Sequence, residues 1–142
     1  MQRSTLLVGI GVGAAAAGAV SHLTSHDWQS IGSPLDQQRL VIRHDAKGEG
    51  SFGAPRSGNR IHQGVDLVAP IGSPVRAIRS GRVIETGAHR GRGRFIELEH
   101  PRQLRSVYAH LQDIRVSVGD RVRQGDVIGT VGKTGNARHP WI

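Results

Sequence analysis

Short apolar runs separated by glycine, proline and polar residues recur along the chain after residue 40. Valine and isoleucine dominate these runs, and over residues 95–99 the side chains alternate with the period of two that is typical of a strand. No segment after Val20 keeps a helical period for three turns. The pattern predicts strands at Leu40–Ile42, Val65–Val68, Val75–Ile78, Val83–Ile84, Phe95–Leu98, Val107–Leu111, Ile114–Val118 and Val127–Val131. Short strands at about ten-residue spacing favour an all-β domain.

Two segments share a glycine–valine pattern. Gly72–Val75 leads to Gly81–Ile84, and Gly119–Val122 leads to Gly125–Ile128; each pair reads Gly-x-x-Val and then Gly-x-Val-Ile. Because glycine adopts a positive φ in tight turns, two hairpins with the same turn chemistry explain the pattern. The alternative is the duplicated motif of a barrel-sandwich hybrid.

The first twenty residues have the composition of an export signal. Arg3 precedes the uncharged run Leu6–Val20, and Ala17–Ala19 offers small residues for cleavage. The run is shorter than the about 20 residues of a membrane-spanning helix, so a cleaved signal peptide is favoured over an uncleaved signal anchor. The predicted boundaries are 1–19 for the signal peptide or signal anchor, 20–40 for a polar linker and 41–142 for the domain. We therefore expect the N-terminal segment to lie outside the fold. We also expect the domain to be exported to the periplasm, the cell envelope or the extracellular space, with membrane contact only through the N-terminal segment.

Composition and charge exclude some kinds of site and partner and favour others. The 142 residues include 20 glycines, which suits a turn-rich β protein, and no cysteine, which excludes a disulfide framework and a thiol nucleophile. With 19 basic and 11 acidic residues the net charge is +8, which favours a polyanionic partner. Nucleic acid is a poor candidate, because aromatic residues make up only 4% and provide few stacking platforms. Arg90, Arg92 and Arg94 either contact an anion or form a solvated loop.

His62 and Asp66 are candidate metal ligands, because imidazole and carboxylate both bind zinc. Residues four apart in an extended chain are separated by about 13 Å, whereas ligand bonds to zinc are about 2 Å long. The chain must therefore bend between the two residues, and Gly64 permits a bend. The alternative for an isolated histidine is a surface or core residue without a ligand, which is the interpretation that we give to His22, His26 and His89.

Tyr108 and His110 form a second candidate pair. If residues 108–111 form a strand, these two side chains share one face of it. A histidine and a tyrosine in one groove provide a base and a hydrogen-bond donor. The alternative is an amphipathic strand with a polar outer face.

Several sequence blocks occur in the order found in the lysostaphin/LytM-type zinc metallopeptidases, which the chain resembles from about Arg43 to Gly135. The matching blocks are Phe52–Arg56, Arg60–Ala77, Ser80–Val83, Tyr108–Leu111 and Val118–Gly135. The resemblance implies a small antiparallel β domain with a substrate groove, related to the duplicated-hybrid-motif and barrel-sandwich folds. It also implies a zinc endopeptidase that cuts peptide bonds in the stems or cross-bridges of bacterial peptidoglycan.

The resemblance assigns roles to single residues. His62 and Asp66 match the first two ligands of one zinc ion, and His110 matches the catalytic histidine of the Tyr-x-His-Leu block. Tyr108 becomes a candidate for substrate binding, with a packing role as the alternative. Peptidoglycan is the implied partner, and it fits the positive charge because the bacterial cell wall contains anionic polymers.

The sequence departs from the family pattern after Gly135. Family members carry a later His-x-His block that supplies a second catalytic histidine and the third zinc ligand. Residues 136–142 contain a single histidine, His139, and Trp141 stands where a second histidine would be. We therefore expect a C-terminally incomplete domain with an exposed sheet edge and a two-ligand zinc site, so that the 142-residue chain alone is inactive.

Three other interpretations remain. The chain could be a non-catalytic family member that binds the cell wall or activates other murein hydrolases, although the presence of His62, Asp66 and His110 argues against that. The Val118–Gly129 block also suggests a lipoyl- or biotinyl-type carrier, but Lys133 lacks the flanking residues of a modified lysine. The third interpretation is a resemblance to secreted animal chemokine-like relatives, which keep the zinc scaffold without peptidase activity.

Overall fold

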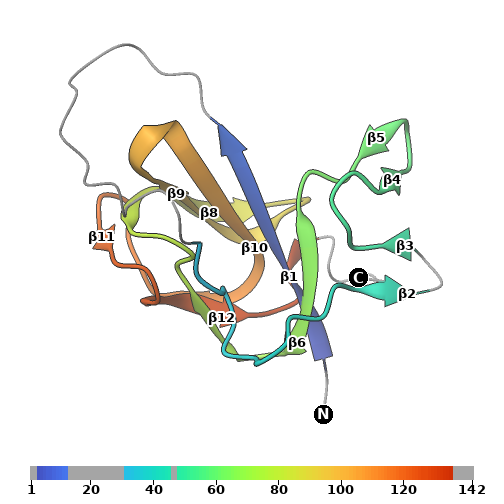
Figure 1. The fold of residues 1–142 in the computed structure, drawn as a ribbon, viewed down its shortest axis with the longest axis horizontal. Helices are drawn as coiled ribbons and strands as arrows, with labels where there is room; N and C mark the ends of the chain where they lie inside the picture. The colour runs from blue at the N-terminus through green and yellow to red at the C-terminus, as the bar shows by residue number, and fades with distance from the viewer. Residues whose placement is uncertain (1–2, 13–30, 46–47, 136–142) are drawn as a thin grey trace.

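A computed structural model describes residues 3–12, 31–45 and 48–135, and these residues form β-strands joined by turns and one short 3-10 helix (Figure 1). The strands are β1 (Arg3–Val12), β2 (His44–Asp45), β3 (Gly48–Glu49), β4 (Pro55–Arg56), β5 (Arg60–Ile61), β6 (Val65–Pro70), β7 (Pro74–Arg76), β8 (Gly81–His89), β9 (Gly93–Glu99), β10 (Leu104–Ile114), β11 (Arg121–Val122) and β12 (Val127–Val131). The 3-10 helix spans Pro101–Gln103. The predicted all-β class is confirmed.

Eight strands form one curled antiparallel sheet. Its order is β11-β8-β9-β10-β1-β6, and β12 pairs with both β10 and β7. The strands β8, β9 and β10 form a long meander, which Figure 1 shows behind the N-terminal strand. The small hairpins β2–β3 and β4–β5 stand together at one side of this sheet, next to β6.

The core lies where β6, β7, β9, β10 and β12 face one another. Alternating apolar side chains of these strands are almost fully buried. Ile78, which follows β7, and Val83 of β8 join this core. The largest fully buried apolar side chains are Tyr108, Ile78, Ile96, Leu98, Leu111, Ile128, Val75, Val83 and Val131. Because alternate residues of a strand point to the same side, the apolar runs recognised in the sequence supply this core directly.

Most predicted strands are present, with two exceptions. Leu40–Ile42 forms only an isolated bridge, in which Ile42 pairs with Leu67. In Ile114–Val118 only Ile114 belongs to a strand, as the last residue of β10, and the rest is irregular, although Val116 still packs against the core. The short hairpins β2–β3 and β4–β5 were not predicted, because two-residue strands are too short to show an alternating pattern.

The backbone conformation agrees with the prediction that the repeated glycines form turns. Gly72, Gly119 and Gly125 all have a positive φ, between 88° and 96°. L-amino acids with side chains rarely adopt this conformation, so glycine is required at these turns.

The N-terminal strand differs from the sequence expectation. The segment predicted to lie outside the fold forms β1, which is inserted between β6 and β10 (Figure 1). Its residues pair with Pro70 to Val65 on one side and with Ala109 to Leu104 on the other. The physical reason is that an apolar β-branched segment satisfies the backbone groups of two strands that otherwise have open edges. An export role for residues 1–19 remains a prediction.

Part of the predicted linker also belongs to the domain. Leu35 is a core residue, and Gly32 donates its N–H to the Ile78 carbonyl at 2.7 Å. Asp36 forms an ion pair with Arg76 of β7. A single buried leucine in a polar stretch gives no periodic signal, so the sequence did not reveal this contact. In the part of the chain that is described, no helix is long and apolar enough to cross a membrane.

Candidate metal and peptidase site

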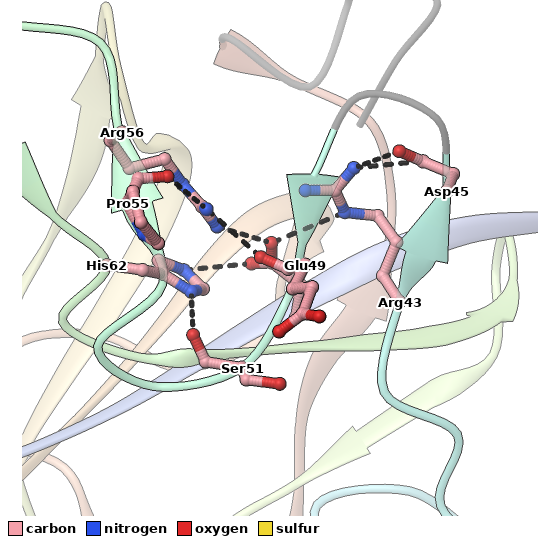
Figure 2. Close-up of polar contacts among 8 residues, drawn as sticks. Arg43, Asp45, Glu49, Ser51, Pro55, Arg56 and His62 are labelled. Atoms are coloured by element: carbon pink, nitrogen blue, oxygen red, sulfur yellow. Dashed lines mark hydrogen bonds and ion pairs between the residues drawn. The ribbon is translucent and has the colours of Figure 1, made fainter.

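The segment before β6 positions His62. The hairpin β4–β5 turns through Gly58 and Asn59, both with positive φ, and returns the chain so that His62 N–H donates to the Ala54 carbonyl at 2.9 Å. The imidazole Nδ1–H donates to the Ser51 carbonyl at 3.1 Å (Figure 2). Because a carbonyl can only accept, this contact fixes the tautomer and leaves the Nε2 lone pair free to bind a metal.

Asp66 lies in β6 with a buried carboxylate. The predicted bend between His62 and Asp66 is confirmed and falls at Gly64. As a result His62 Nε2 lies 3.2 Å from Asp66 Oδ1. Two ligand atoms on one tetrahedral zinc are about 3.3 Å apart, given ligand bonds of about 2.0–2.1 Å. The two predicted ligands therefore have the separation that a shared zinc ion requires.

Two arginines flank the other carboxylate oxygen. Arg43 Nε and Arg56 Nη2 each lie 3.4 Å from Asp66 Oδ2. Arg43 also holds Asp45 at 2.9 Å, as Figure 2 shows. A buried carboxylate needs such partners, because an unpaired charge in the interior is costly. The arginines occupy Oδ2 and leave Oδ1 directed at His62.

The sequence analysis did not assign a role to Arg43 or Arg56. The available signal was the polar, glycine-rich segment before His62, which carries arginines near a candidate metal ligand in the sequence. Arg43 directly precedes β2 and Arg56 lies in β4. The spacing of these arginines in the sequence does not show that they lie next to Asp66.

A close backbone approach holds this segment in place. Asp66 N–H donates to the Gly50 carbonyl, and Arg43 N–H donates to the Asp66 carbonyl, both at 2.8 Å. A Cβ at Gly50 would lie 2.7 Å from the Asp66 Cβ and 3.1 Å from the Arg43 Cβ. Only glycine fits here without a shift of the ligand strand.

His110 lies in β10 at an irregular point of the strand. The register with β9 shifts between Tyr108 and Leu111, and His110 has a φ of 61°. Its N–H donates to the Arg92 carbonyl at 2.7 Å, and its Nδ1–H donates to the Thr134 carbonyl at 2.9 Å. A left-handed backbone conformation is costly for a residue other than glycine. Non-glycine residues with a positive φ cluster at functional sites. Here the two hydrogen bonds to backbone carbonyls and the bulge hold this conformation.

The environment of His110 keeps its imidazole neutral. Burial lowers the pKa of His110 below its ordinary value, although the Thr134 carbonyl and the Asp66 charge oppose this shift. The charge of a protonated His62 would lower the pKa of His110 further. Because Nδ1 carries the proton, Nε2 is the basic atom. The structure places His62 against Asp66, and the charges of both act on the pKa of His110; the roles of the three residues stay predictions.

The prediction for Tyr108 is corrected. The bulge ends the regular alternation, so Tyr108 and His110 do not share one face of the strand. Tyr108 is fully buried, and its hydroxyl accepts the Ile78 N–H at 2.9 Å and bonds Ser106 at 3.1 Å. Tyr108 is a core residue without exposed surface, which agrees with the packing alternative.

Other sequence candidates lie elsewhere. Arg92 stacks over the Phe95 ring, with 5.6 Å from its guanidinium carbon to the ring centroid, and Arg94 donates to the Gln112 carbonyl. Two of the three loop arginines therefore have internal partners. His89 is exposed at the same hairpin tip, in agreement with its interpretation as a surface residue. His22, His26 and His139 lie outside the described residues.

The donor set of the site suits zinc, but it is not complete in the described ranges. Residues 3–12, 31–45 and 48–135 contain no group of three histidine, cysteine, aspartate or glutamate side chains placed to hold a metal ion. His62 and Asp66 supply one nitrogen and one oxygen ligand, whereas a catalytic zinc takes three protein ligands and one open position.

Comparison with known proteins decides the family. The model of peptidase family M23 matches residues 60–142, which is more than half of the chain. The chain belongs to peptidase family M23. The M23 relatives include the peptidoglycan DD-endopeptidase ShyC of Vibrio cholerae, 37% identical over 111 residues that make up 78% of this chain and 25% of the relative. Lysostaphin of Staphylococcus staphylolyticus is 44% identical over 84 residues, which are 58% of this chain and 18% of the relative.

Solved M23 structures agree with the fold. The catalytic domain of lysostaphin from Staphylococcus simulans superposes with a TM-score of 0.56 and 39% identity, over 64% of this chain and 69% of that domain. A zinc-containing peptidase from Vibrio cholerae gives a TM-score of 0.62 and 28% identity, over 75% of this chain and 33% of that structure. The chain spans about a quarter or less of the length of the curated M23 relatives named here.

Proposed function

We propose that this M23 chain is the catalytic domain of an exported zinc endopeptidase that hydrolyses peptide bonds in bacterial peptidoglycan. The observation that carries the proposal is the arrangement of His62 Nε2 and Asp66 Oδ1, 3.2 Å apart, beside a buried neutral His110. Relatives named as peptidoglycan and glycyl-glycine endopeptidases support the substrate class. The predicted signal in residues 1–19 and the net charge of +8 support export to an anionic cell wall.

The residues divide the chemistry between them. His62 through Nε2 and Asp66 through Oδ1 would hold the zinc ion, with the third ligand outside this pair. Bound zinc supplies a Lewis acid, which polarises the scissile carbonyl and lowers the pKa of water to about 7. Ser51 orients His62, and the two arginines at Oδ2 compensate the charge of Asp66 and leave Oδ1 directed at His62.

His110 moves the proton. Its Nε2 accepts a proton from the attacking water as the water oxygen bonds the carbonyl carbon. The same atom then returns the proton to the amine nitrogen as the C–N bond breaks. The Thr134 carbonyl holds the ring in the required tautomer throughout, because Nδ1–H remains bonded to it at 2.9 Å.

The test uses the protein as its own organism makes it, with a His110→Ala allele in the same gene. Digestion of purified peptidoglycan should release soluble fragments with new amino groups in the parent, and none in the variant. Zinc content should be equal in both proteins, because His110 is not a ligand. Residual turnover within about tenfold of the parent would contradict the role of His110, since general-base catalysis is worth about 10²–10⁴-fold. Binding to peptidoglycan without cleavage by the parent would instead support a non-catalytic binding module.

A further inference from the structure

The tip of the β8–β9 hairpin carries positive charges that play no part in the proposed chemistry. His89 and Gly93 pair across the tip, and residues 90–92 form the three-residue loop between them. Within the loop, His89 Nδ1 accepts the Gly91 N–H at 3.1 Å. Residues 86–95 contain three arginines and no aspartate or glutamate, so their net charge is +3.

Backbone contacts fix this tip against the strand that carries His110. The Arg92 carbonyl accepts the His110 N–H at 2.7 Å, and the Arg94 N–H donates to Thr134 Oγ1 at 2.9 Å. The carbonyl of the same threonine accepts the His110 Nδ1–H. The backbone of the loop is therefore held next to the histidine that we propose as the proton carrier.

A fourth cation reaches the tip from a distant part of the sequence. Lys133 follows β12 and is exposed, and its neighbour Thr134 packs tightly on the tip: a Cβ at Gly93 would lie 2.3 Å from Thr134 Oγ1. Residues 127–135 contain no acidic residue. The one acid of β10, Asp113, accepts the Thr130 hydroxyl at 3.2 Å. The lysine thus adds to the positive charge of the tip.

The four cations differ in their freedom to bind a ligand. Arg92 and Arg94 already have internal partners, an aromatic ring and a backbone carbonyl. Arg90 and Lys133 are exposed, and neither side chain has a hydrogen bond or an ion pair among the residues that the structure describes. Like charges that are held together repel one another, and a bound anion relieves this repulsion. Guanidinium and ammonium groups both bind carboxylates through charge-assisted hydrogen bonds.

We propose that Arg90 and Lys133 form an anion subsite, next to His110, that binds a carboxylate of the peptide substrate. The side chains of a peptide that are negatively charged at neutral pH are carboxylates, and its C-terminus is another. The subsite therefore selects acidic peptides over the same peptides with carboxamides in place of carboxylates. Arg92 and Arg94 keep their internal partners and contribute a positive field. The inference rests on the proposed function, because it takes a peptide as the ligand of the site.

The test measures binding of the full chain to one pair of ligands by calorimetry, which needs no turnover. Soluble peptides that a separate amidase releases from purified peptidoglycan are compared with the same peptides after carbodiimide and ammonium convert their carboxyl groups to carboxamides. The parent should bind the acidic form at least about fivefold more tightly at low salt, and added salt should reduce this preference. The double variant Arg90→Gln, Lys133→Gln should bind both forms equally.

The matched control is the double variant Arg82→Gln, Arg121→Gln. It also removes two positive charges, and these two exposed residues pair across β8 and β11, with Arg82 at the end of β8 away from the tip. The control should keep the preference of the parent. Equal binding of both peptide forms by the parent would overturn the inference, as would an equal loss of preference in the two double variants. Failure of the proposed function has a different signature, because the parent would then bind neither form, and the inference would fall with it.

Discussion

At the scale of single residues, hydrogen bonds to backbone carbonyls determine what the site can do. Ser51 and Thr134 each accept the Nδ1–H of a histidine, and this fixes a free Nε2 on His62 and on His110. The sequence reveals the histidines but not these carbonyls, because a carbonyl is present at every residue and only the fold selects one. His110 was predicted from its motif, whereas its φ of 61° depends on a bulge that no local pattern announces.

Gly50→Ala tests the close approach to the ligand strand. The added Cβ would lie 2.7 Å from the Asp66 Cβ, so β6 or the segment at Arg43 must shift. We expect a loss of about 1–3 kcal/mol in the free energy of unfolding and weaker zinc binding, measured by denaturant unfolding and zinc titration. Gly87→Ala is the matched control, because its nearest neighbour is the Phe95 ring at 3.5 Å and the substitution should be neutral. A Gly50→Ala protein as stable as the Gly87→Ala protein would show that the approach imposes no constraint.

At the scale of elements, a buried polar network joins the meander β8–β9–β10. His100 follows β9, and its Nδ1–H donates to the Ser80 carbonyl at 2.9 Å. Its Nε2 accepts from Ser106 at 2.7 Å, and Ser106 in turn bonds Tyr108. This chain of contacts explains why Tyr108 is buried: its hydroxyl has partners inside the core, as a buried hydroxyl requires.

The network predicts a pH dependence of stability. Burial lowers the pKa of His100 below 6.5, the Arg79 charge adds to this, and the bond to Ser80 opposes it. The unfolded chain therefore binds the proton at a higher pH than the folded chain, so stability is complete above about pH 6.5 and decreases as the pH falls below it. His110 shifts in the same direction and contributes the same sign.

The measurement is the free energy of unfolding between pH 7.5 and pH 5 in the parent, in His100→Gln and in the exposed control His44→Gln. The loss of stability toward pH 5 should be smaller in His100→Gln, because a titrating group is removed. Part of the loss should remain in this variant, because His110 still titrates with the same sign. His44→Gln should follow the parent. An identical slope in all three proteins would contradict the assignment to His100.

At the scale of the whole molecule, the class of the fold was predictable and the occupancy of one sheet position was not. The runs that form β6, β8, β9, β10 and β12 carry their own alternation, so the antiparallel core follows from local patterns. The same apolar composition makes Leu6–Val20 resemble an export signal and makes β1 suitable for the interval between β6 and β10. Composition cannot distinguish these two uses, because both require only an uncharged apolar segment.

The placement of the candidate site was partly predictable for a similar reason. His62, Asp66 and His110 belong to recognisable motifs, and the bend at Gly64 follows from the length of an extended chain. Arg43 and Arg56 lie next to Asp66 because of the hairpins β2–β3 and β4–β5. Their two-residue strands pair only in the folded domain. Contacts of that kind are set by tertiary structure and have no periodic signature.

A zinc titration tests whether His62 and Asp66 form the metal site of this M23 chain. The titration compares the parent with His62→Ala and with His89→Ala, a histidine exposed at the tip of the β8–β9 hairpin. We predict that His62→Ala weakens zinc binding by at least about tenfold, since it removes one of two first ligands, and that His89→Ala matches the parent. Equal zinc affinity in all three proteins would contradict the account.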